Sequence, residues 1–363
     1  MWDYLVIGGG IAGLSAGAAL ASLGRVLLVE GEAVLGHHTS GRSAALYEAD
    51  YGAPATVAVA RASEAALRAM GVLSPRGLML LGGPEDEATF ARDCEDLRMR
   101  PLALAEARAM VPILHPEAVT MAALTESAQD IDTDAMMQHY ARALRAAGGE
   151  IRTRAPVSAI ARDGEGWRVV AGGETLSARR IVNAAGAWAD GIARMAGVAP
   201  VGITPLRRSM AQIPAPADHD IRHWPMLIGA GETWYAKPQA GKLLVSPADE
   251  DPTDPHDAWP DDMVLAEGLA RYEAMVTEPV TRLEASWAGL RSFSPDRALV
   301  LGPDPSAPGF LWCAGQGGQG FLSAPGAASV LLEAAGGAPS GQPGSVIAAL
   351  SPARFRNVQG RRL

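Results

Sequence analysis

Residues 3–30 constrain this chain more than any other stretch: DYLVIGGGIAGLSAGAALASLGRVLLVE. An apolar run leads into the spacing G-x-G-x-x-G at Gly8, Gly10 and Gly13, then an Ala/Leu-rich helical pattern, then a second apolar run that ends in Glu30. This order of strand, glycine turn, helix and strand is typical of a βαβ unit that binds a dinucleotide. The glycines let the backbone approach a pyrophosphate, and the helix N-terminus faces the phosphates with free N–H groups.

Glu30 narrows the choice of dinucleotide. A carboxylate at the end of the second strand can accept hydrogen bonds from both ribose hydroxyls of an adenosine, and it disfavours a 2′-phosphate, so NADP is not expected. The unit alone does not decide between NAD and FAD. The alternative to a dinucleotide site is a glycine-rich turn between strand and helix that binds no ligand.

Composition excludes several classes of protein. The 363 residues are long for a single core and favour two domains. The net charge of −9 argues against a nucleic-acid partner. No apolar run is long enough to span a membrane and the N-terminus lacks a basic region, so we expect a cytoplasmic protein with neither transmembrane segment nor signal peptide. Cys94 and Cys313 form no disulfide framework or metal cluster, and His37 and His38 lack a third ligand at metal spacing, so no metal site is expected.

Periodicity places the remaining elements. It predicts helices over 54–70, 132–147 and 323–335 with a charged helical layer at 84–112, and strands at 77–81, 151–154, 157–162, 167–171, 177–183 and 310–314. The segment GQGGQGF (315–321) lies between the last strand and the last helix, so the order strand, glycine cluster, helix recurs near the end of the chain.

Taken together, these pieces resemble the D-amino acid oxidase-like family of FAD enzymes, and within it the D-arginine dehydrogenases. The segments that carry the resemblance are DYLVIGGGIAG (3–13), HHTSGRSAALYEADYGAP (37–54), DIDTDA (130–135), VNAAGAWAD (182–190), PLRRSM (205–210), HWPML (223–227), WYAKP (234–238), WAGLRSF (287–293) and AGQGGQG (314–320). The resemblance implies an α/β (mixed α+β) fold. A Rossmann-like FAD-binding domain would comprise residues 1–46, 127–205 and 285–363. A discontinuous substrate-binding domain built on an antiparallel sheet would comprise 47–126 and 206–284.

The same resemblance implies FAD as the cofactor. The residues it assigns to FAD are Gly8, Gly10, Ile11, Ala12, Gly13, Glu30, Ser40, Gly41, Arg42, Ser43, Ala44, Ala45, Val157, Ala185, Gly186, Trp188, Gly317, Gly318, Gln319, Gly320 and Phe321. Family members with covalent flavin attach it through a Cys near the segment equivalent to 287–303, which has no Cys here. We therefore expect noncovalent FAD and a buried, unreactive Cys313.

The chemistry implied is oxidative deamination. A hydride passes from Cα to flavin N5, and the resulting imino acid hydrolyses to a 2-oxo acid and ammonia. The protein's task is then to fix the substrate over the flavin, for which a forked Arg–carboxylate contact is suited. The resemblance assigns that contact to Arg291 and Arg208, with Arg207 as the neighbouring alternative. It also assigns Tyr235 as a hydroxyl donor to the substrate carboxylate and Tyr51 as a residue that closes over the substrate.

The side-chain pocket departs from the resemblance. The D-arginine dehydrogenases carry a His, a Thr and a Glu at the positions of Leu46, Glu48 and Leu78, so polar partners of a guanidinium have become leucines. This favours neutral, largely apolar D-amino acids. Glu48 is expected to face solvent. If its carboxylate turns into the pocket instead, it holds a cationic D-amino acid.

The electron acceptor stays open among a quinone, an electron-transfer protein and O₂. Some oxidases of the family place a Lys over the flavin, and the matching position here is Leu243. Lys237 and Lys242 flank a predicted hairpin turn and are expected in solvent, which favours a dehydrogenase. The alternatives are an oxidase of glycine, sarcosine or a cyclic amine, and a flavin-bound redox sensor or assembly subunit without turnover. The sequence does not predict the oligomeric state.

Overall fold

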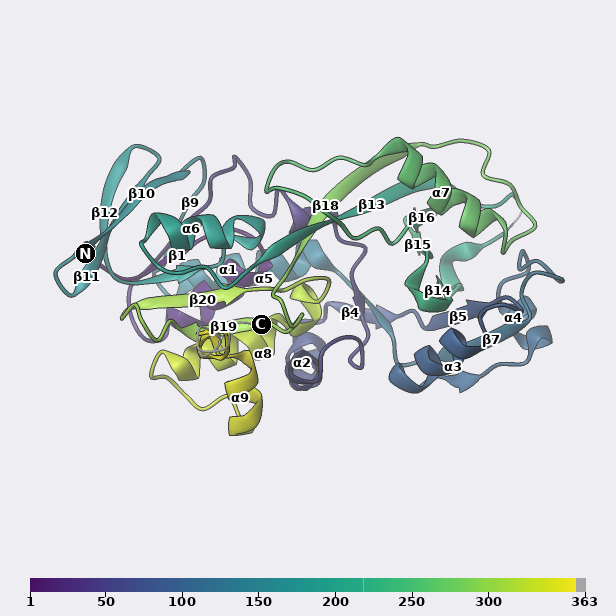
Figure 1. Cartoon of the computed structure of the whole chain (residues 1–363), viewed down its shortest axis with the longest axis horizontal. Coiled ribbons are helices and arrows are strands. Elements are labelled where there is room, and N and C mark those ends of the chain that lie inside the picture. Colours follow the sequence, from purple (N-terminus) through teal and green to yellow (C-terminus); the bar gives the residue numbers. More distant parts are fainter. Residues whose placement is uncertain (218, 357–363) are drawn as a thin grey trace, which may run out of the picture.

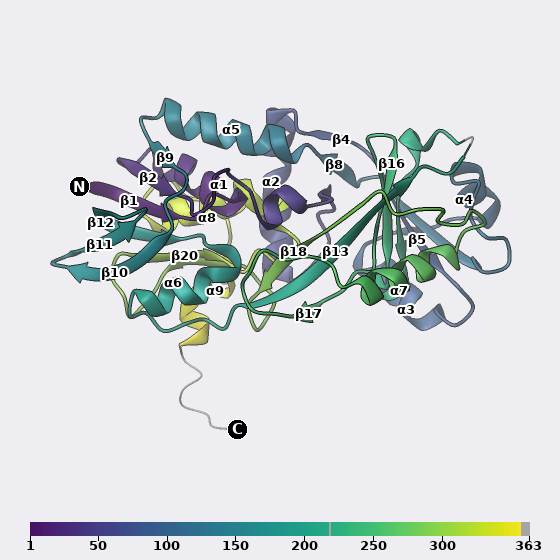
Figure 2. The same cartoon turned by 90° about the horizontal axis from the view of Figure 1, so that it is seen from above.

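The computed structural model describes residues 1–217 and 219–356, which form two sheets placed side by side (Figure 1). The first sheet has the order β10-β11-β12-β1-β2-β9, with β20 joined to β12 and β19 joined to β20. The second has the order β17-β13-β16-β15-β14-β5-β7-β6, with β18 joined to β13. Figure 2 shows the long strands β13 and β18 running from the middle of the molecule into the second sheet.

The N-terminal βαβ unit forms as predicted, from β1 (Trp2–Ile7), α1 (Ile11–Leu20) and β2 (Val26–Val29). The glycines are fixed by close approach. Gly8 has φ +112°, and a Cβ there would lie 2.4 Å from the Ala184 carbonyl oxygen. A Cβ on Gly13 would lie 1.9 Å from the Gly8 carbonyl oxygen. Any larger residue would therefore push α1 away from the strands.

The first sheet is completed by strands from the middle and the end of the chain. These are β9 (Glu150–Arg152), β10 (Val157–Asp163), β11 (Gly166–Ala171), β12 (Glu174–Asn183), β19 (Val300–Pro303) and β20 (Phe310–Ala314). The strands β9, β2, β1, β12 and β20 are parallel to their neighbours within this run. Their carboxyl ends therefore meet at one edge, where ligands bind in open α/β sheets.

Helices cover both faces of this sheet. Residues of α1, α2 (Pro54–Met70), α5 (Thr133–Ala146) and α8 (Gly320–Ala334) share one apolar core with the strands. A second core on the other face includes α6 (Ala189–Met195). The helix α9 (Gly344–Leu350) packs near α2, and it was not predicted from the sequence.

The second sheet carries the opposite wall of the molecule. Its strands are β5 (Leu78–Gly82), β6 (Arg100–Pro101), β7 (Met121–Thr125), β13 (Thr204–Pro214), β14 (Met226–Gly229), β15 (Tyr235–Gln239), β16 (Lys242–Ser246), β17 (Asp251–Pro252) and β18 (Ala285–Phe293). All paired neighbours are antiparallel except β14 and β5, which are parallel. One face packs in an apolar core with residues of α4 (Leu104–Met110) and α7 (Asp262–Glu273), and α3 (Glu87–Asp96) lies beside β5.

Short elements join the two sheets. A small third sheet is formed by β3 (Leu46–Tyr47), β8 (Gln129–Ile131) and β4 (Leu73–Pro75). The 3₁₀ turns are η1 (Thr39–Arg42), η2 (Gly186–Trp188), η3 (Ile221–His223), η4 (Ala230–Glu232) and η5 (Pro352–Phe355).

The mixed fold with a Rossmann-like half and a largely antiparallel second sheet is confirmed. The division into chain segments stays a prediction, and residues 357–363 of its last segment lie outside the described residues. No helix among the described residues has the length and apolar character needed to cross a membrane.

Candidate active site

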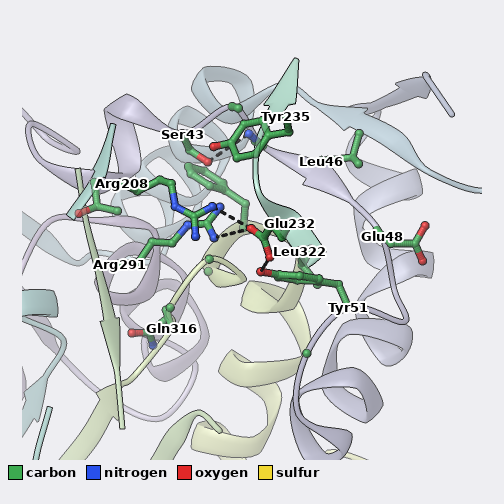
Figure 3. Close-up of a pocket in the computed structure, with 18 of the residues that line it drawn as sticks. Ser43, Leu46, Glu48, Tyr51, Arg208, Glu232, Tyr235, Arg291, Gln316 and Leu322 are labelled. Carbon is green, nitrogen blue, oxygen red and sulfur yellow. Dashed lines mark hydrogen bonds and ion pairs between the residues drawn. The ribbon is translucent and has the colours of Figure 1, made fainter. Parts of the chain in front are cut away.

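A cavity of about 780 Å³ lies between the two sheets. One end is lined by the start of α1, the loop 39–46 and the segment 316–322. The other end is lined by the inner face of the second sheet and by residues of the loop 48–54 and α3. The parts of the chain predicted to hold the cofactor and those predicted to hold the substrate therefore meet in one space (Figure 3).

Most residues assigned to FAD line this cavity. They are Gly10, Ile11, Ala12, Ser40, Arg42, Ser43, Ala44, Ala45, Gly186, Gly317, Gly318, Gly320 and Phe321. The other assigned residues, Gly8, Gly13, Glu30, Gly41, Val157, Ala185, Trp188 and Gln319, are not part of its lining. Trp188 instead stacks near His38, with ring centroids 4.6 Å apart.

The geometry at the start of α1 fits a phosphate-bearing cofactor. Gly10 is the N-cap and offers no side-chain cap, and the Ile11 N–H donates to Ser40 Oγ at 3.1 Å. A Cβ on Gly10 would lie 3.0 Å from Ser40 Oγ, which is a tight contact. Glycine at this position therefore lets the backbone of residue 10 lie close to Ser40. The remaining N–H groups of the first turn favour an anion there.

The loop η1 is held by hydrogen bonds to distant parts of the chain. Thr39 Oγ1 donates to the Leu290 carbonyl oxygen at 2.8 Å. Arg42 donates to the carbonyl oxygens of Ala258 and Ala288, each at 2.8 Å, and pairs with Asp257. The Arg42 guanidinium therefore holds the loop to β18 and to residues 257–258, which is a structural role that the sequence did not reveal.

Glu30 stands at the end of β2 with a fixed carboxylate. Its Oε2 accepts from the Gly9 N–H at 2.6 Å, and its Oε1 accepts from the Glu32 N–H at 2.8 Å. Each carboxylate oxygen has a further acceptor site. The residue thus fits the ribose role while also bracing the glycine turn.

The predicted carboxylate anchors come together on two paired strands. Arg291 lies on β18 and Arg208 on β13, with Leu206 opposite Arg291 and Gly289 opposite Arg208 in the register. Figure 3 shows both guanidinium groups in one cluster, with Tyr235 close by. Tyr235 is buried, and its ring centroid is 5.9 Å from Arg208 Cζ. Arg207 faces elsewhere and pairs with Asp249 and Asp251.

The two arginines differ in how fully they are engaged. Arg208 donates to the Asp249 carbonyl oxygen at 2.9 Å, to Glu232 at 2.7 Å and to Glu250 at 3.1 Å. Arg291 has Glu232 as its ion-pair partner, at the longer distance of 3.4 Å. Burial alone would lower the pKa of Arg291, but the acidic groups Tyr51, Tyr235 and Glu232 outweigh it and raise the pKa. Arg291 therefore stays charged and keeps donors for a ligand.

Glu232 is the site residue that sequence reasoning missed. It lies in η4, with φ +53°, and its Oε2 accepts from the Tyr51 hydroxyl at 2.9 Å. Burial opposes its ionisation, but Arg291 and Arg208 hold its pKa below the usual value. Because its place depends on the turn geometry between β14 and β15, no pattern in the sequence could have revealed it.

The wall beside this cluster is apolar. Leu46, Leu78, Leu80, Met210, Met226 and Ile228 line the cavity. They pack in one cluster on the inner face of the second sheet. The predicted leucine pair is thus part of a larger apolar surface.

The expectation that Glu48 faces solvent is wrong. Its side chain is buried, its Oε1 accepts from the Asp50 N–H at 3.1 Å, and its Oε2 has no hydrogen-bond partner among the described residues. Burial raises the pKa of Glu48 to about 7. Figure 3 shows its carboxylate beyond Tyr51 and turned away from the arginines.

The expectation for Lys237 is also wrong. The hairpin between β15 and β16 forms, but Lys237 is buried on the cavity side of β15, 2.9 Å from Asp130 Oδ1, and it donates to the carbonyl oxygens of Ala44 and Ala45. Burial lowers the pKa of Lys237. Lys242 is half-exposed beside Glu284. Leu243 points to the outer core of the sheet and not to the cavity, because alternate residues of a strand face opposite sides.

The remaining polar candidates lie outside the cavity. Cys313 is buried as predicted, and burial raises the pKa of its thiol to about 12. His37 and His38 do have a third neighbour, since Glu32 brings a carboxylate oxygen within 4.8 Å of their ring nitrogens. Asp257 also lies near both rings, 3.6 Å from His37 Nε2 and 3.8 Å from His38 Nδ1, and it forms an ion pair with Arg42.

Comparison with known proteins identifies a family and a fold for the chain. The family model described as FAD dependent oxidoreductase (DAO) matches residues 3–334. Glycine oxidase of Geobacillus kaustophilus is 25% identical over 353 residues, which cover 89% of this chain and 90% of that protein. Hydrogen cyanide synthase subunit HcnC of Pseudomonas aeruginosa is 27% identical over 194 residues, but the match covers only 51% of this chain and 43% of that subunit.

Solved structures have the same fold. The crystal structure of the G. kaustophilus glycine oxidase superposes with a TM-score of 0.83 at 23% identity, covering 97% of this chain and 98% of that one. L-proline dehydrogenase from P. horikoshii gives a TM-score of 0.81 at 20% identity, covering 98% of each chain.

Proposed function

Because the chain belongs to the family of FAD-dependent oxidoreductases, we propose that it oxidises D-amino acids with neutral, largely apolar side chains, as a dehydrogenase. One observation carries the proposal: a guanidinium with free donors, Arg291, and an apolar wall share a single cavity with the residues that fit FAD. When bound, FAD supplies the acceptor for the two electrons of amine oxidation.

The residues around the cavity divide the remaining tasks. Arg291 binds the substrate carboxylate through its fork, and the Tyr235 hydroxyl supports it. The carboxylate then fixes the direction of the Cα–H bond. The apolar wall receives the side chain and gains about 0.8 kcal/mol for each CH₂ it buries. The imino acid product hydrolyses in water to the 2-oxo acid and ammonia.

An anaerobic titration of the FAD-loaded protein tests this function. Apolar D-amino acids such as D-leucine, D-methionine and D-phenylalanine should bleach the flavin band, and their L-enantiomers serve as the control, because the D preference rests on family resemblance. A flavin that no amino acid or amine bleaches would favour the redox sensor or assembly subunit. Bleaching by L-enantiomers alone would refute the stereochemical part.

The same reaction in air separates a dehydrogenase from an oxidase. The relatives include a glycine oxidase, so an oxidase of glycine, sarcosine or a cyclic amine is the competing proposal. Lys237 is buried, but it is bound by Asp130 and by the carbonyl oxygens of Ala44 and Ala45 and is not part of the cavity lining. On this ground we expect little hydrogen peroxide and rapid transfer to an artificial quinone acceptor. Stoichiometric peroxide with glycine or sarcosine would favour the oxidase.

Buried Glu48 motivates a second candidate substrate class, the cationic D-amino acids. A buried carboxylate oxygen that has no hydrogen-bond partner within residues 1–217 and 219–356 is a natural acceptor for a cation. Comparison of kcat/KM for D-leucine and D-arginine decides between them. A preference for D-arginine that Glu48→Gln selectively removes would assign the cationic class to this enzyme, whereas a preference for D-leucine supports the apolar pocket.

A further inference from the structure

The turn η4 holds a carboxylate of the protein itself between the two anchoring arginines. Oε1 of Glu232 is 2.7 Å from Arg208 Nη1 and 3.4 Å from Arg291 Nη1, and Oε2 accepts from the Tyr51 hydroxyl. Arg208 and Arg291 are the residues assigned to the carboxylate of a substrate, and Tyr51 is the residue assigned to close over it. Figure 3 shows the Glu232 carboxylate at the centre of this group.

The backbone of the turn is held in an unfavourable conformation. Glu232 has φ +53° and follows Gly231 with φ +71°. A side-chain-bearing residue adopts this left-handed region only when its surroundings compensate. Here the compensation comes from the two arginines and Tyr51 at the side chain, and from Asp93, whose Oδ2 accepts from the Gly231 N–H at 2.6 Å.

Arg291 keeps free donors, but a ligand carboxylate that contacts both arginines cannot simply join Glu232 in this place. Arg208 already donates to Glu232, to Glu250 and to a backbone carbonyl oxygen. A further buried carboxylate would repel the two already present, and that repulsion is strong where water is excluded.

We propose that Glu232 is an internal ligand of the carboxylate clamp, and that a substrate binds by exchanging its own carboxylate for that of Glu232. This inference rests on the proposed function for the identity of the substrate. Exchange makes Glu232 a specificity residue: an amine without a carboxylate cannot take over the contacts of Glu232 and leaves the turn in place. When the turn is released, its backbone strain is relieved, and this gain partly offsets the loss of the Glu232 ion pairs.

The test uses the FAD-loaded protein and benzoate, an apolar carboxylate that cannot be oxidised, with binding followed by the change in the flavin spectrum. Glu232→Gln should lower the Kd for benzoate by about tenfold or more, because the competing charge is gone. Glu250→Gln is the matched control: it also removes a carboxylate from Arg208, but Glu250 is not part of the cavity lining. If charge alone mattered, both variants would bind benzoate more tightly to the same degree.

Hydrogen–deuterium exchange on the wild-type protein supplies a second readout that needs no variant. Saturation with benzoate should speed amide exchange in residues 229–233, whereas benzylamine should leave it unchanged. Equal effects of the two variants, failure of Glu232→Gln to bind benzoate more tightly, or unchanged exchange would each overturn the inference. Because benzoate is not turned over, the inference can hold even if no D-amino acid is oxidised, and then the proposed function alone would fail.

Discussion

Replacement of Gly318 by Ala should displace the guanidinium of the substrate anchor Arg291 while Arg291 itself is unchanged. A Cβ on Gly318 would lie 2.9 Å from Arg291 Cζ, 3.0 Å from Nη1 and 3.1 Å from Nε. Ordinary contact begins at 3.4 Å, so the guanidinium must retreat by about half an ångström. Gly318 is not among the glycines with positive φ, so alanine causes no backbone strain there. Because Gly318 is also assigned to FAD, the FAD content has to be compared together with the activity.

The size of the effect follows from the precision that the anchor requires. A misplacement of about 1 Å can cost roughly 100-fold in rate, so half that distance should lower kcat/KM on the order of tenfold, or about 1.4 kcal/mol. Steady-state kinetics with the best D-amino acid from the titration would measure the loss. FAD content, read from the visible spectrum, shows whether the cofactor is retained.

Gly191→Ala is the matched control for that experiment. Gly191 lies in α6, and a Cβ there has no atom within 4 Å, so activity should stay at the wild-type level. The reasoning is refuted if Gly318→Ala retains both FAD and the wild-type kcat/KM. It would also fail if the two variants lost activity equally.

Three further predictions concern the anchor, the cofactor and a buried acid. Arg291→Ala should lower kcat/KM by an amount equivalent to about 2–5 kcal/mol. Arg291→Lys should restore only part of the activity, because an ammonium cannot form two parallel hydrogen bonds to a carboxylate. Near-wild-type kinetics for Arg291→Ala would exclude the carboxylate clamp. Glu30→Ala should weaken FAD retention by about 1–3 kcal/mol, measured by fluorescence titration of the apoprotein, and acid precipitation should release all FAD; flavin left on the polypeptide would show a covalent link. Glu48 binds its proton more tightly when folded, since burial raises its pKa from 4.5 to about 7, so its contribution to stability is full below pH 4.5 and is lost as pH rises to 7. Glu48→Gln should therefore raise the free energy of unfolding at pH 8 relative to wild type by up to about 3 kcal/mol, and by much less at pH 4.5. Denaturant unfolding measures both values. An equal change at the two pH values would contradict the prediction.

Local patterns predicted the elements whose ends are set by local chemistry. The predicted bounds of the helix 54–70 match those of α2. Pro54 suits its first turn, and the structure shows Gly71, with φ +69°, capping its end. Asp132 caps α5 in the same local way, accepting from the Ala135 N–H at 2.9 Å. Such signals need no knowledge of distant residues.

The errors share the opposite property, because each depends on what another part of the chain places nearby. Lys237 stands beside a hairpin turn, where exposure is the usual outcome, but Asp130 and the backbone of residues 44 and 45 meet it on the cavity face. Glu48 is buried by packing that no periodicity describes. Glu232 reaches the arginines through a left-handed residue in a turn, and the sequence does not specify that conformation. The family resemblance identified Arg291 and Arg208, but only the structure shows how many hydrogen bonds each guanidinium already makes.

The bonds that fix the loop η1 also set an order of events during synthesis. Thr39 and Leu290 exchange two hydrogen bonds across 251 positions of sequence, and Arg42 reaches Ala288 across 246. While a ribosome is making the first half of the chain, Ser40 of this loop can already pair with Ile11, but the partners of Thr39 and Arg42 on β18 and at residues 257–258 have not yet been made. We therefore expect this loop to reach its final geometry, and FAD to be captured, only after residue 290 has left the ribosomal tunnel.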